Sequence, residues 1–344
     1  MKKHVFIIGS RGLPAKYGGF ETFVEELVKH QNNKNIKYHV ACQSENSDMA
    51  LPGEHFEYLG ADCFVIKLPK IGSARVIAYD ILAINVALKY CKKEEIKAPV
   101  FYILGNTAGG FIGHYANKIH KLGGKLFVNP DGLEWKRTKW AAPIRSYLKF
   151  AEKKMVRYAD LIISDNAGIK EYLTSEYGQV ESEVIAYGTE KFKSDLTESE
   201  TLVKYKVNDY YLIVGRFVPE NNYETLIRAF MKSSTKRDLV IITNHEGNAY
   251  FKELREKTQF DKDARIKFVG TVYNQNELRY IREHAFAYLH GHEVGGTNPS
   301  LLEALGSTSL NLLLNVGFNQ EVGLDSCIYW GKEKNNLKHL IEHV

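Results

Sequence analysis

The sequence predicts an α/β protein with two doubly wound parallel sheets that face each other across a cleft. Two observations lead to this fold. Short runs of β-branched and aromatic residues alternate with amphipathic helical patterns, which is the order of strand–helix–strand units. The alternation stops in the charged, weakly periodic stretch 187–209 and then starts again. We therefore expect Rossmann-like domains at 1–187 and 209–344, joined by a linker at 188–208.

The expected strands are short apolar runs bounded by residues that favour turns. In the first half they are "HVFIIGS" (4–10), "KYHVACQ" (37–43), "CFVIKLP" (63–69), "PVFYILG" (99–105), "KLFVNPD" (125–131) and "LIISDN" (161–166). In the second half they are "YYLIVGR" (210–216), "DLVIITN" (238–244), "RIKFVGT" (265–271) and "AFAYLHG" (285–291). Continuous apolar runs of this kind are typical of parallel strands buried on both faces.

The expected helices repeat apolar residues with a period near 3.6. They include "ETFVEELVKHQ" (21–31), "SARVIAYDILAINVALKYCKK" (73–93), "NYETLIRAFMKS" (222–233) and "PSLLEALGS" (299–307). Pro299 would open the last of these, at the helical position where its missing amide hydrogen costs nothing.

Composition excludes several classes of protein. The chain is 44% hydrophobic and 25% charged, as globular proteins are. Its four scattered cysteines form no C-x-x-C pair, so we expect free thiols rather than a zinc or redox site. The longest apolar stretch, 76–91, carries Asp80 and is too short to span a bilayer. The start of the chain is typical of a first strand rather than a signal peptide, which predicts a cytoplasmic protein.

Positive charge is concentrated in the first half of the chain. Residues 1–187 hold 26 Lys and Arg against 20 Asp and Glu, and the rest holds 20 against 21. Within 135–158, eight basic residues and several aromatic ones accompany a single acid, Glu152. One interpretation is a solvated helix face whose aromatic residues pack inward. The other is a peripheral surface for anionic lipid at the inner face of the plasma membrane, and no motif indicates nucleic acid.

The stretch "GSRGLPAKYGGFETF" (9–23) places Gly18 and Gly19 between a strand and a helix. The unsatisfied amides and positive end of a helix suit an anion or a close-lying sugar. The pattern is not G-x-G-x-x-G, so dinucleotide binding is not predicted. The alternative is a tight turn that needs glycine for its backbone angles.

The stretch "LIVGRFVPENNYETLIRAF" (212–230) places Arg216 directly after a strand that ends at Gly215. The guanidinium group can bind two oxygens of a diphosphate at once. A structural ion pair is the alternative role for this arginine.

The stretch "HGHEVGGTNPSLLEALG" (290–306) combines a strand end, a glycine turn and a helix start. The amides of Gly296, Thr297 and Asn298 would point at an anion. Glu303 lies early in the helix and could reach a ribose diol. The alternative is a proline-started helix with a solvated glutamate.

In this order, the three stretches resemble the GT-B glycosyltransferases of the large retaining family 4. That family has a glycine pair in its first loop, a G-R opening its second domain and an E-x7-E motif at the donor site. More narrowly, the chain resembles bacterial rhamnosyltransferases of capsule and cell-wall polysaccharide assembly in "IIGSRGLPAKYGGFETFVEEL", "NPDGLEWKRTKW", "GRFVPENNYETLI" and "HEVGGTNPSLLEAL". The resemblance implies a retaining transfer of L-rhamnose from dTDP-rhamnose to a lipid-linked sugar. The N-terminal domain would hold the acceptor and the C-terminal domain the nucleotide sugar.

The resemblance also implies a role for each matching residue. Gly18 and Gly19 would approach the donor diphosphate and the acceptor. Arg216 would clamp the diphosphate, Glu303 would hold the ribose, and Glu293 would touch the donor sugar.

Several features depart from the family pattern. Nine residues, not seven, separate Glu293 from Glu303, so His292 competes with Glu293 for the sugar contact. The lysine expected after G-R is replaced by Asn221, and we expect Lys16 or Arg11 to supply its charge. Relatives also continue into helices that cross back to the first domain, so we expect the second domain to be shortened at its end.

The mechanism implied by the resemblance needs no metal ion and no cofactor. Arg216 and the helix start would stabilise the leaving diphosphate electrostatically. Asp131 takes the place where many relatives have a catalytic-site histidine, and it would orient or deprotonate the acceptor hydroxyl. The metal-motif spelling "DKD" (261–263) is expected to be a solvated loop, and Tyr273 is a candidate for stacking on the nucleotide base.

Three alternatives stay open at this point. The same fold could use a UDP-hexose donor, because pocket shape decides the sugar. The chain could be a non-catalytic subunit that binds nucleotide sugars, since a fold does not fix a function. It could also be an epimerase with the same two-domain architecture.

Overall fold

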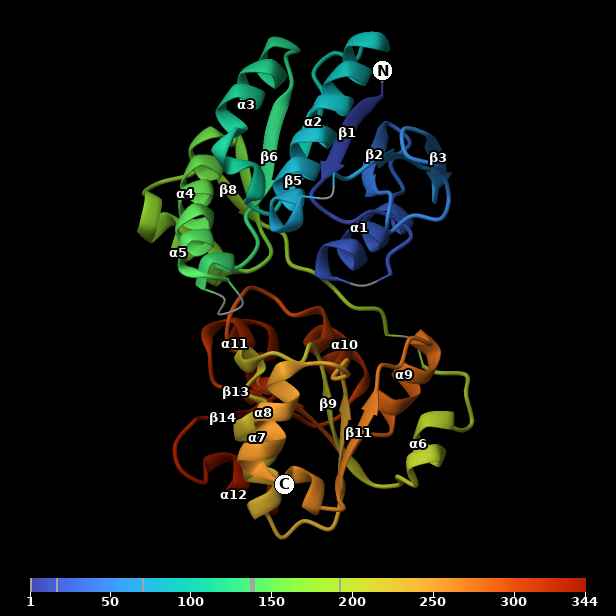
Figure 1. The fold of residues 1–344 in the computed structure, drawn as a ribbon, viewed down its shortest axis with the longest axis vertical. Helices are drawn as coiled ribbons and strands as arrows, with labels where there is room; N and C mark the ends of the chain where they lie inside the picture. The colour runs from blue at the N-terminus through green and yellow to red at the C-terminus, as the bar shows by residue number, and fades with distance from the viewer. Residues whose placement is uncertain (1, 17, 70, 137–139, 192) are drawn as a thin grey trace. The chain divides into compact units, whose positions relative to one another are not determined.

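The computed structural model of this protein describes every residue except 1, 17, 70, 137–139 and 192. The chain divides into two compact units, Met1–Ala186 and Tyr187–Val344. Each unit is built around one sheet with helices packed against it (Figure 1). No helix in the described part of the chain is both long and apolar enough to cross a membrane.

The first unit has an eight-stranded sheet in the order β3-β4-β2-β1-β5-β6-β7-β8. Its strands are β1 (Lys3–Ile8), β2 (Ile36–Gln43), β3 (His55–Tyr58), β4 (Ala61–Ile66), β5 (Val100–Leu104), β6 (Lys125–Asn129), β7 (Leu161–Ser164) and β8 (Ser182–Val184). All neighbours are parallel except β3 and β4, which form an antiparallel edge. The sequence patterns did not single out β3 and β8, which are short and only partly buried.

Helices connect these strands and cover the sheet. They are α1 (Gly19–Lys29), α2 (Arg75–Lys93), α3 (Ile112–Lys121), α4 (Ala142–Tyr158) and α5 (Ala167–Tyr177), with 3-10 turns η1 (Gly72–Ala74), η2 (Thr107–Gly110) and η3 (Glu134–Lys136). α2 packs beside α3, and α3 packs beside α4.

The second unit has a fully parallel sheet of six strands in the order β11-β10-β9-β12-β13-β14. Its strands are β9 (Tyr210–Val214), β10 (Asp238–Ile242), β11 (Ile266–Gly270), β12 (Ala287–His290), β13 (Asn311–Leu314) and β14 (Ile328–Trp330). Its helices are α6 (Glu200–Tyr205), α7 (Tyr223–Lys232), α8 (Ala249–Thr258), α9 (Gln275–Glu283), α10 (Pro299–Ser307), α11 (Gly317–Gly323) and α12 (Asn336–His343), with 3-10 turns η4 (Pro219–Asn221), η5 (Phe260–Lys262) and η6 (Leu324–Ser326).

Both faces of the second sheet are buried. Successive residues of β9 alternate between two hydrophobic clusters: Tyr211 and Ile213 belong to one, and Tyr210 and Leu212 to the other. The same alternation holds along β10 and β12. Burial on both faces is why these strands appear in the sequence as continuous apolar runs.

Strand order reverses once in each sheet. In the first unit the chain builds outward from β1 through β2 to β4, then crosses to β5 on the other side of β1. In the second unit it builds from β9 through β10 to β11, then crosses to β12 beside β9. In open α/β sheets, ligands bind at the carboxyl ends of the strands where the order reverses. The ends of β1 and β5, and of β9 and β12, are therefore the expected ligand sites.

Gly9, just after β1, is pressed against the end of β5. Its φ is +112°, and an added Cβ would lie 2.0 Å from the carbonyl oxygen of Leu104. Gly53 has a similar φ of +92° but open space around it. We expect Gly53→Ala to cost about 1 kcal/mol through backbone strain alone, and Gly9→Ala to cost about 3 kcal/mol or more because the clash is added. Denaturant unfolding measures both, and equal losses would contradict this packing.

Asp80, on α2, is a fully buried carboxyl group. Its Oδ2 accepts a hydrogen bond from the Thr107 hydroxyl, and its Oδ1 has no partner among the described residues. Burial raises the pKa of Asp80 to about 7, although the bond from Thr107 lowers it.

This raised pKa predicts a pH-dependent cost of folding. The unfolded carboxyl has a pKa of about 3.9, so stability falls as the pH rises from about 4 to about 7. We expect Asp80→Asn to stabilise the protein by up to about 4 kcal/mol at pH 8, and the gain to disappear near pH 4. Urea unfolding at the two pH values checks this, with the exposed Asp325→Asn as control. A gain that does not depend on pH would contradict it.

Candidate functional site

One backbone carbonyl oxygen connects the carboxyl ends of β9 and β12 with the start of α10. The carbonyl oxygen of Val214, the last residue of β9, accepts hydrogen bonds from the Tyr288 hydroxyl at 3.0 Å and the Ser300 hydroxyl at 3.1 Å. Tyr288 is a fully buried residue of β12, and Ser300 lies in the first turn of α10. The helix start is therefore fixed at the point where the strand order reverses.

The predicted glycine turn leads directly into α10. Asn298 is the N-cap, and its side chain accepts a hydrogen bond from the amide of Ser300 at 2.9 Å. Pro299 is the first helical residue, as the sequence predicts. Gly296 and Thr297 immediately precede the cap, and Thr297 is buried. The amides of Ser300 and Leu301 both donate to Asn298, so this helix start favours a negatively charged group through its positive end.

Arg216 follows β9 at the same edge and is exposed. Its guanidinium group makes no hydrogen bond or ion pair within the described part of the chain, although its carbonyl oxygen accepts one from Asn221. The alternative role for this arginine was a structural ion pair, and no acidic residue in the described part of the chain forms one with it. The cation is therefore available to an external anion.

Two asparagines replace the lysine that the resemblance led us to expect. Asn221 donates to the carbonyl oxygen of Arg216 at 2.7 Å, so its amide oxygen faces His292 and accepts from Nδ1 at 2.9 Å. Asn222, with φ of 54°, donates to the carbonyl oxygen of Gly291 at 2.8 Å and to Glu293 at 3.1 Å. The pair braces the loop after β9 against the loop after β12.

Glu293 is held by neighbours of its own chain. Both carboxylate oxygens lie 2.7 Å from Nζ of Lys332, which follows β14. Partial burial raises the pKa of Glu293, but the hydrogen bonds from Lys332 and Asn222 outweigh it, and the net pKa is below the usual value. Glu293 is therefore ionised and engaged at neutral pH.

Glu303 lies on α10 and pairs with Arg282 of α9. Arg282 is almost fully buried, whereas the Glu303 side chain is 37% exposed. The arginine can therefore orient the carboxylate while leaving it partly open to solvent. Sequence reasoning did not single out Arg282, because no local motif marks a buried arginine.

His290 is a second residue that the sequence did not single out. It is the last residue of β12 and is 4% exposed, and its Nε2 has no partner among the described residues. Burial, and then the nearby His292, lowers the pKa of His290 well below its usual value, so the ring is neutral. The two rings lie 6.0 Å apart between centroids.

Two other predicted features lie farther along the carboxyl edge or have partners of their own. Tyr273 is 74% exposed in the loop after β11, which is separated from β9 by β10. In the "DKD" stretch, Asp261 pairs with Arg255 and Asp263 pairs with Arg265.

In the first unit, the side chain closest to Gly18 is the carboxylate of Glu21. Gly18 has φ of 133°, and an added Cβ would lie 1.8 Å from Oε2 of Glu21. That carboxylate is buried and also accepts a hydrogen bond from the amide of Arg11 at 2.6 Å. Gly19 is exposed and begins α1. The glycine at 18 thus makes room for a side chain that closes the loop.

The two cations suggested as replacements for the missing lysine lie in this loop. Lys16 forms an exposed ion pair with Asp48 at 2.6 Å, which is worth little because solvent screens it. Arg11 is exposed, and its side chain makes no ion pair within the described part of the chain.

Asp131 lies after β6, whose neighbour β5 is at the reversal of strand order. It has a left-handed φ of 58°, and its amide donates to the Asn129 side chain at 3.0 Å. Its own carboxylate accepts from the amide of Gly132 at 2.8 Å. Asn106, two residues after β5, donates to the carbonyl oxygen of Pro130 and fixes the same loop.

Residues 2–190 match the model of a protein family described as "Domain of unknown function (DUF1972)". The chain belongs to this family. The match includes the loop with Gly18 and the strand end with Asp131, whereas the β9–β12 edge lies beyond it. A search of the curated proteins gave no match.

Solved structures resemble the whole chain. A sucrose-phosphate synthase from Thermosynechococcus elongatus has a TM-score of 0.76 at 15% identity, covering 99% of this chain and 89% of that one. "Trehalose-6-phosphate from E. coli bound with UDP-2-fluoro glucose" has 0.70 at 10%, covering 98% and 90%. HepE from Anabaena in complex with UDP has 0.66 at 14%, covering 98% and 88%. At these identities the likeness shows the fold alone, which is the GT-B fold of glycosyltransferases.

The basic stretch 135–158 of this family member is only partly a solvated surface. Lys149 is bound inside a cluster: it lies 4.6 Å from the ring centroid of Trp135 and 2.6 Å from the Tyr172 hydroxyl. Glu152, 2% exposed, accepts from Tyr172 and Tyr177. The remaining described basic residues of α4 are not in this cluster, and residues 137–139 lie outside the described part.

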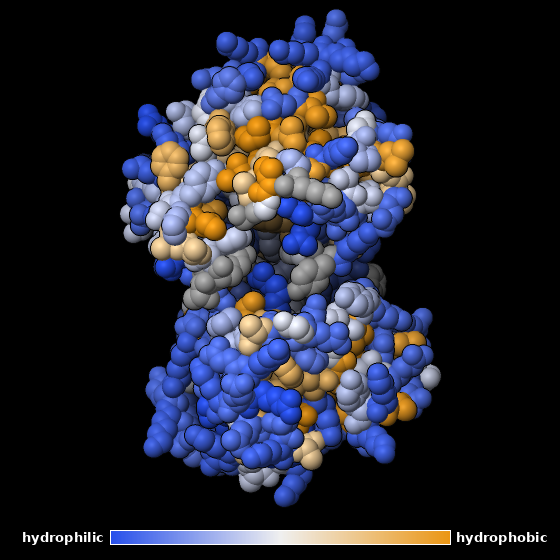
Figure 2. All heavy atoms as spheres, viewed as in Figure 1, coloured by the Kyte–Doolittle hydropathy of each residue, from blue (hydrophilic) through white to orange (hydrophobic). Residues whose placement is uncertain are grey.

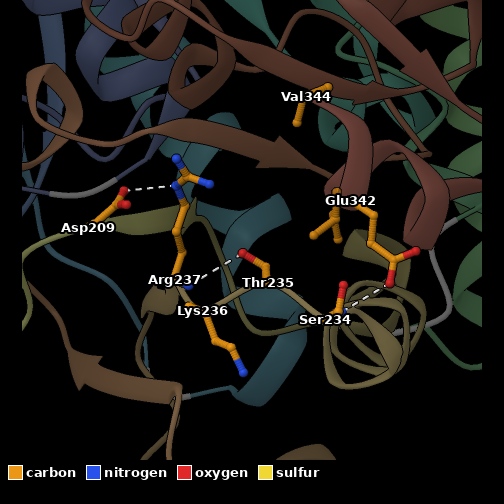
Figure 3. Close-up of a pocket in the computed structure, with 8 residues that line it drawn as sticks. Asp209, Ser234, Thr235, Lys236, Arg237, Glu342 and Val344 are labelled. Atoms are coloured by element: carbon orange, nitrogen blue, oxygen red, sulfur yellow. Dashed lines mark hydrogen bonds and ion pairs between the residues drawn. The ribbon is translucent and has the colours of Figure 1, made fainter.

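Two shallow pockets lie at other places in the units. One, of about 400 Å³, is lined by Ser234–Arg237 together with Asp209 and the end of α12 (Figure 3). There Arg237 turns toward Asp209, 2.9 Å away, and Ser234 donates to Glu342. The other, of about 410 Å³, lies where β7 and β8 begin. Both are at amino ends of strands, so neither coincides with the edges where α/β sheets bind ligands.

The bracing role of Asn222 can be measured as stability. We expect Asn222→Ala to cost about 2–3 kcal/mol, because hydrogen bonds are lost and alanine is strained at this φ. Asn222→Gly loses the same hydrogen bonds without the strain and should cost about 1 kcal/mol less. Denaturant unfolding of the two variants separates the loss of hydrogen bonds from the backbone strain. An alanine variant as stable as wild type would show that Asn222 does not stabilise the two loops.

Proposed function

We propose that this protein is a glycosyltransferase that takes its sugar from a nucleoside diphosphate donor. The observation that carries the proposal is Arg216, which has no ion pair within the described part of the chain. It lies at the edge where α10 begins and the strand order of the second sheet reverses. Two of the similar structures are described as holding UDP or a UDP sugar, which supports the donor class. The nucleotide would lie on the second unit.

The chemistry of the leaving group fits these residues. Breaking the sugar–phosphate bond leaves a diphosphate with growing negative charge. Arg216 can bind two of its oxygens, and the amides of Gly296 and Asn298 in the turn before α10 would donate to others. Stabilisation of developing charge by fixed donors is usually the largest part of catalysis. Glu303, oriented by Arg282, would accept hydrogen bonds from the ribose hydroxyls.

The finer proposal concerns the sugar and its acceptor. The four stretches that resemble bacterial rhamnosyltransferases favour transfer of L-rhamnose from dTDP-rhamnose, with retention, to a lipid-linked sugar of capsule or cell wall. Asp131 would orient or deprotonate the acceptor hydroxyl. We further propose that the protein works at the cytoplasmic face of the membrane, with 135–158 toward anionic lipid. A UDP-hexose is the alternative donor, because UDP is what the similar structures carry.

A second candidate function is nucleotide-sugar binding without transfer. It is favoured by the engagement of Glu293 with Lys332 and by asparagine in place of the expected lysine. Turnover distinguishes the two functions.

A transfer assay tests the proposal directly. The purified protein is incubated in EDTA with dTDP-rhamnose and a synthetic lipid-diphosphate GlcNAc or glucose acceptor, and product mass is followed. We expect a product heavier by one deoxyhexose. A product only with a UDP-hexose would keep the glycosyltransferase and replace the sugar. No product with any donor, from protein that binds nucleotide, would favour the non-catalytic function.

The role of Arg216 is tested by nucleotide binding. Because a hydrogen bond to a charged group is worth about 1.5–3 kcal/mol, Arg216→Met should weaken dTDP or UDP binding about 10- to 100-fold. The matched control is Lys236→Met, which removes one exposed charge at the amino edge of the same sheet. Calorimetry measures both, and equal affinity in the two variants would remove Arg216 from the site.

Asp131 is tested by separating binding from chemistry. Asp131→Asn keeps the size and the hydrogen bond from Gly132 but removes the charge. We expect donor affinity to stay and transfer to fall about 100-fold or more, the usual range for a general base. Transfer at the wild-type rate would exclude this role.

A further inference from the structure

Helices α2, α3 and α4 of the first unit carry no exposed acid between their first and last residues. The three helices contain only two acids, Asp80 and Glu152, and each is 2% exposed. Both have partners inside the unit: Thr107 donates to Asp80, and Tyr172 and Tyr177 donate to Glu152. We call the outward side of α2, α3 and α4 the three-helix face.

The same helices carry eleven basic residues, four on α2, two on α3 and five on α4. They are Arg75, Lys89, Lys92, Lys93, Lys118, Lys121, Arg145, Lys149, Lys153, Lys154 and Arg157. Three of them pair with acids: Arg75 with Glu45, Lys93 with Glu94, and Lys149 with Glu152 and Glu176. The other eight make no ion pair within the described part of the chain. Unbalanced charge of one sign indicates a partner of the opposite sign.

Large apolar side chains are exposed among these charges. Val76, Leu82 and Val86 on α2 are 41%, 39% and 36% exposed. Phe111, at the start of α3, is 55% exposed, and Phe150 on α4 is 49% exposed with Nζ of Lys154 5.5 Å from its ring centroid. Figure 2 shows hydrophobic residues gathered over α2 and the neighbouring α3. Such a cluster is more than the scattered apolar residues of an ordinary surface.

We propose that the three-helix face binds the surface of an anionic lipid bilayer. Basic side chains would meet the phosphate groups, and the exposed valine, leucine and phenylalanine side chains would enter the boundary between headgroups and acyl chains. Each basic residue near such a surface strengthens binding about fivefold. This surface extends the stretch 135–158, which includes α4 only, to α2 and α3.

The combination of basic and apolar side chains on the three-helix face favours a lipid bilayer over other polyanionic partners. A nucleic acid or an acidic protein would be satisfied by the lysines and arginines, but neither chemistry requires aliphatic side chains beside them. A lipid bilayer offers an anionic layer and an apolar layer at successive depths. The three-helix face presents groups for both.

Vesicle co-sedimentation tests the proposal. Vesicles of phosphatidylcholine with phosphatidylglycerol should bind the protein, pure phosphatidylcholine vesicles should bind it far less, and salt should weaken the binding. The double variant Lys89→Glu/Lys118→Glu, on α2 and α3, should bind at least about 25-fold more weakly. The control Lys236→Glu/Lys252→Glu makes the same change of net charge on the second unit and should bind as wild type.

A second variant tests the apolar part. Leu82→Ser/Phe150→Ser keeps every charge and should lower vesicle binding about tenfold at a fixed salt concentration. Nucleotide binding, measured in parallel, should be unchanged. Thermal stability should fall slightly, because both side chains are half-buried and serine is the weaker helix former. If this variant binds vesicles as wild type, or if both charge variants lose binding equally, the proposal is overturned. An RNA duplex that displaces the vesicles at equal phosphate concentration would also overturn it.

The inference rests on the proposed function only in that a lipid-linked acceptor gives the protein a reason to meet a membrane. The vesicles carry no sugar, so the two can fail separately. Vesicle binding without transfer activity would support the lipid-binding role of the three-helix face and contradict the proposed enzyme. Transfer without vesicle binding would support the enzyme and overturn the lipid-binding role.

Discussion

The candidate nucleotide site depends on one carbonyl oxygen, that of Val214 at the end of β9. Tyr288 on β12 and Ser300 on α10 both donate to it, so a strand, its neighbour and a helix start are anchored to one atom. Tyr288 is fully buried, and its hydroxyl also lies 3.3 Å from that of Ser300, so the three groups form one small hydrogen-bonded network. Arg216, two residues beyond Val214, extends from this fixed point.

Near the carboxyl edges of the two sheets, the glutamate carboxylates have partners inside the protein. The arginine at the second edge has none in the described part of the chain. Glu293 is bound by Lys332, Glu303 by Arg282, and Glu21 by the amide of Arg11. Arg216 has no such partner in the described part of the chain. An acid with a partner does not repel an incoming anion as strongly as a free one, and an unpaired arginine attracts it. This sorting of charge makes the second unit better suited to a diphosphate than to a cation.

On the first unit, the helical period of the sequence places acidic and basic residues on opposite sides of the helices. Asp80 on α2 and Glu152 on α4 fall on the inward sides of their helices, and most basic residues fall on the outward sides. Lys149 is the exception, because Trp135 and the tyrosines of α5 enclose it. Counting basic residues along the sequence therefore overstates the exposed positive charge of 135–158 and misses the exposed positive charge of α2 and α3. Burial of the acids, rather than a surplus of lysine alone, produces the positive face.

Local periodicity in the sequence by itself determined the long buried strands, several of the helices and the glycine turn that ends at Pro299, because neighbouring residues set these patterns. The short strands β3, β8, β13 and β14 were not predicted. Local periodicity also placed Arg216 and Asp131 just beyond strand ends and Glu303 on the helix that Pro299 opens. Side-chain partners could not be predicted, because they come from distant segments: Lys332 reaches Glu293, and Arg282 reaches Glu303. Gly18 shows the difference most clearly. The sequence predicted that an external ligand approaches Gly18, which stays a prediction, and only the fold showed that the carboxylate of Glu21 lies beside this glycine.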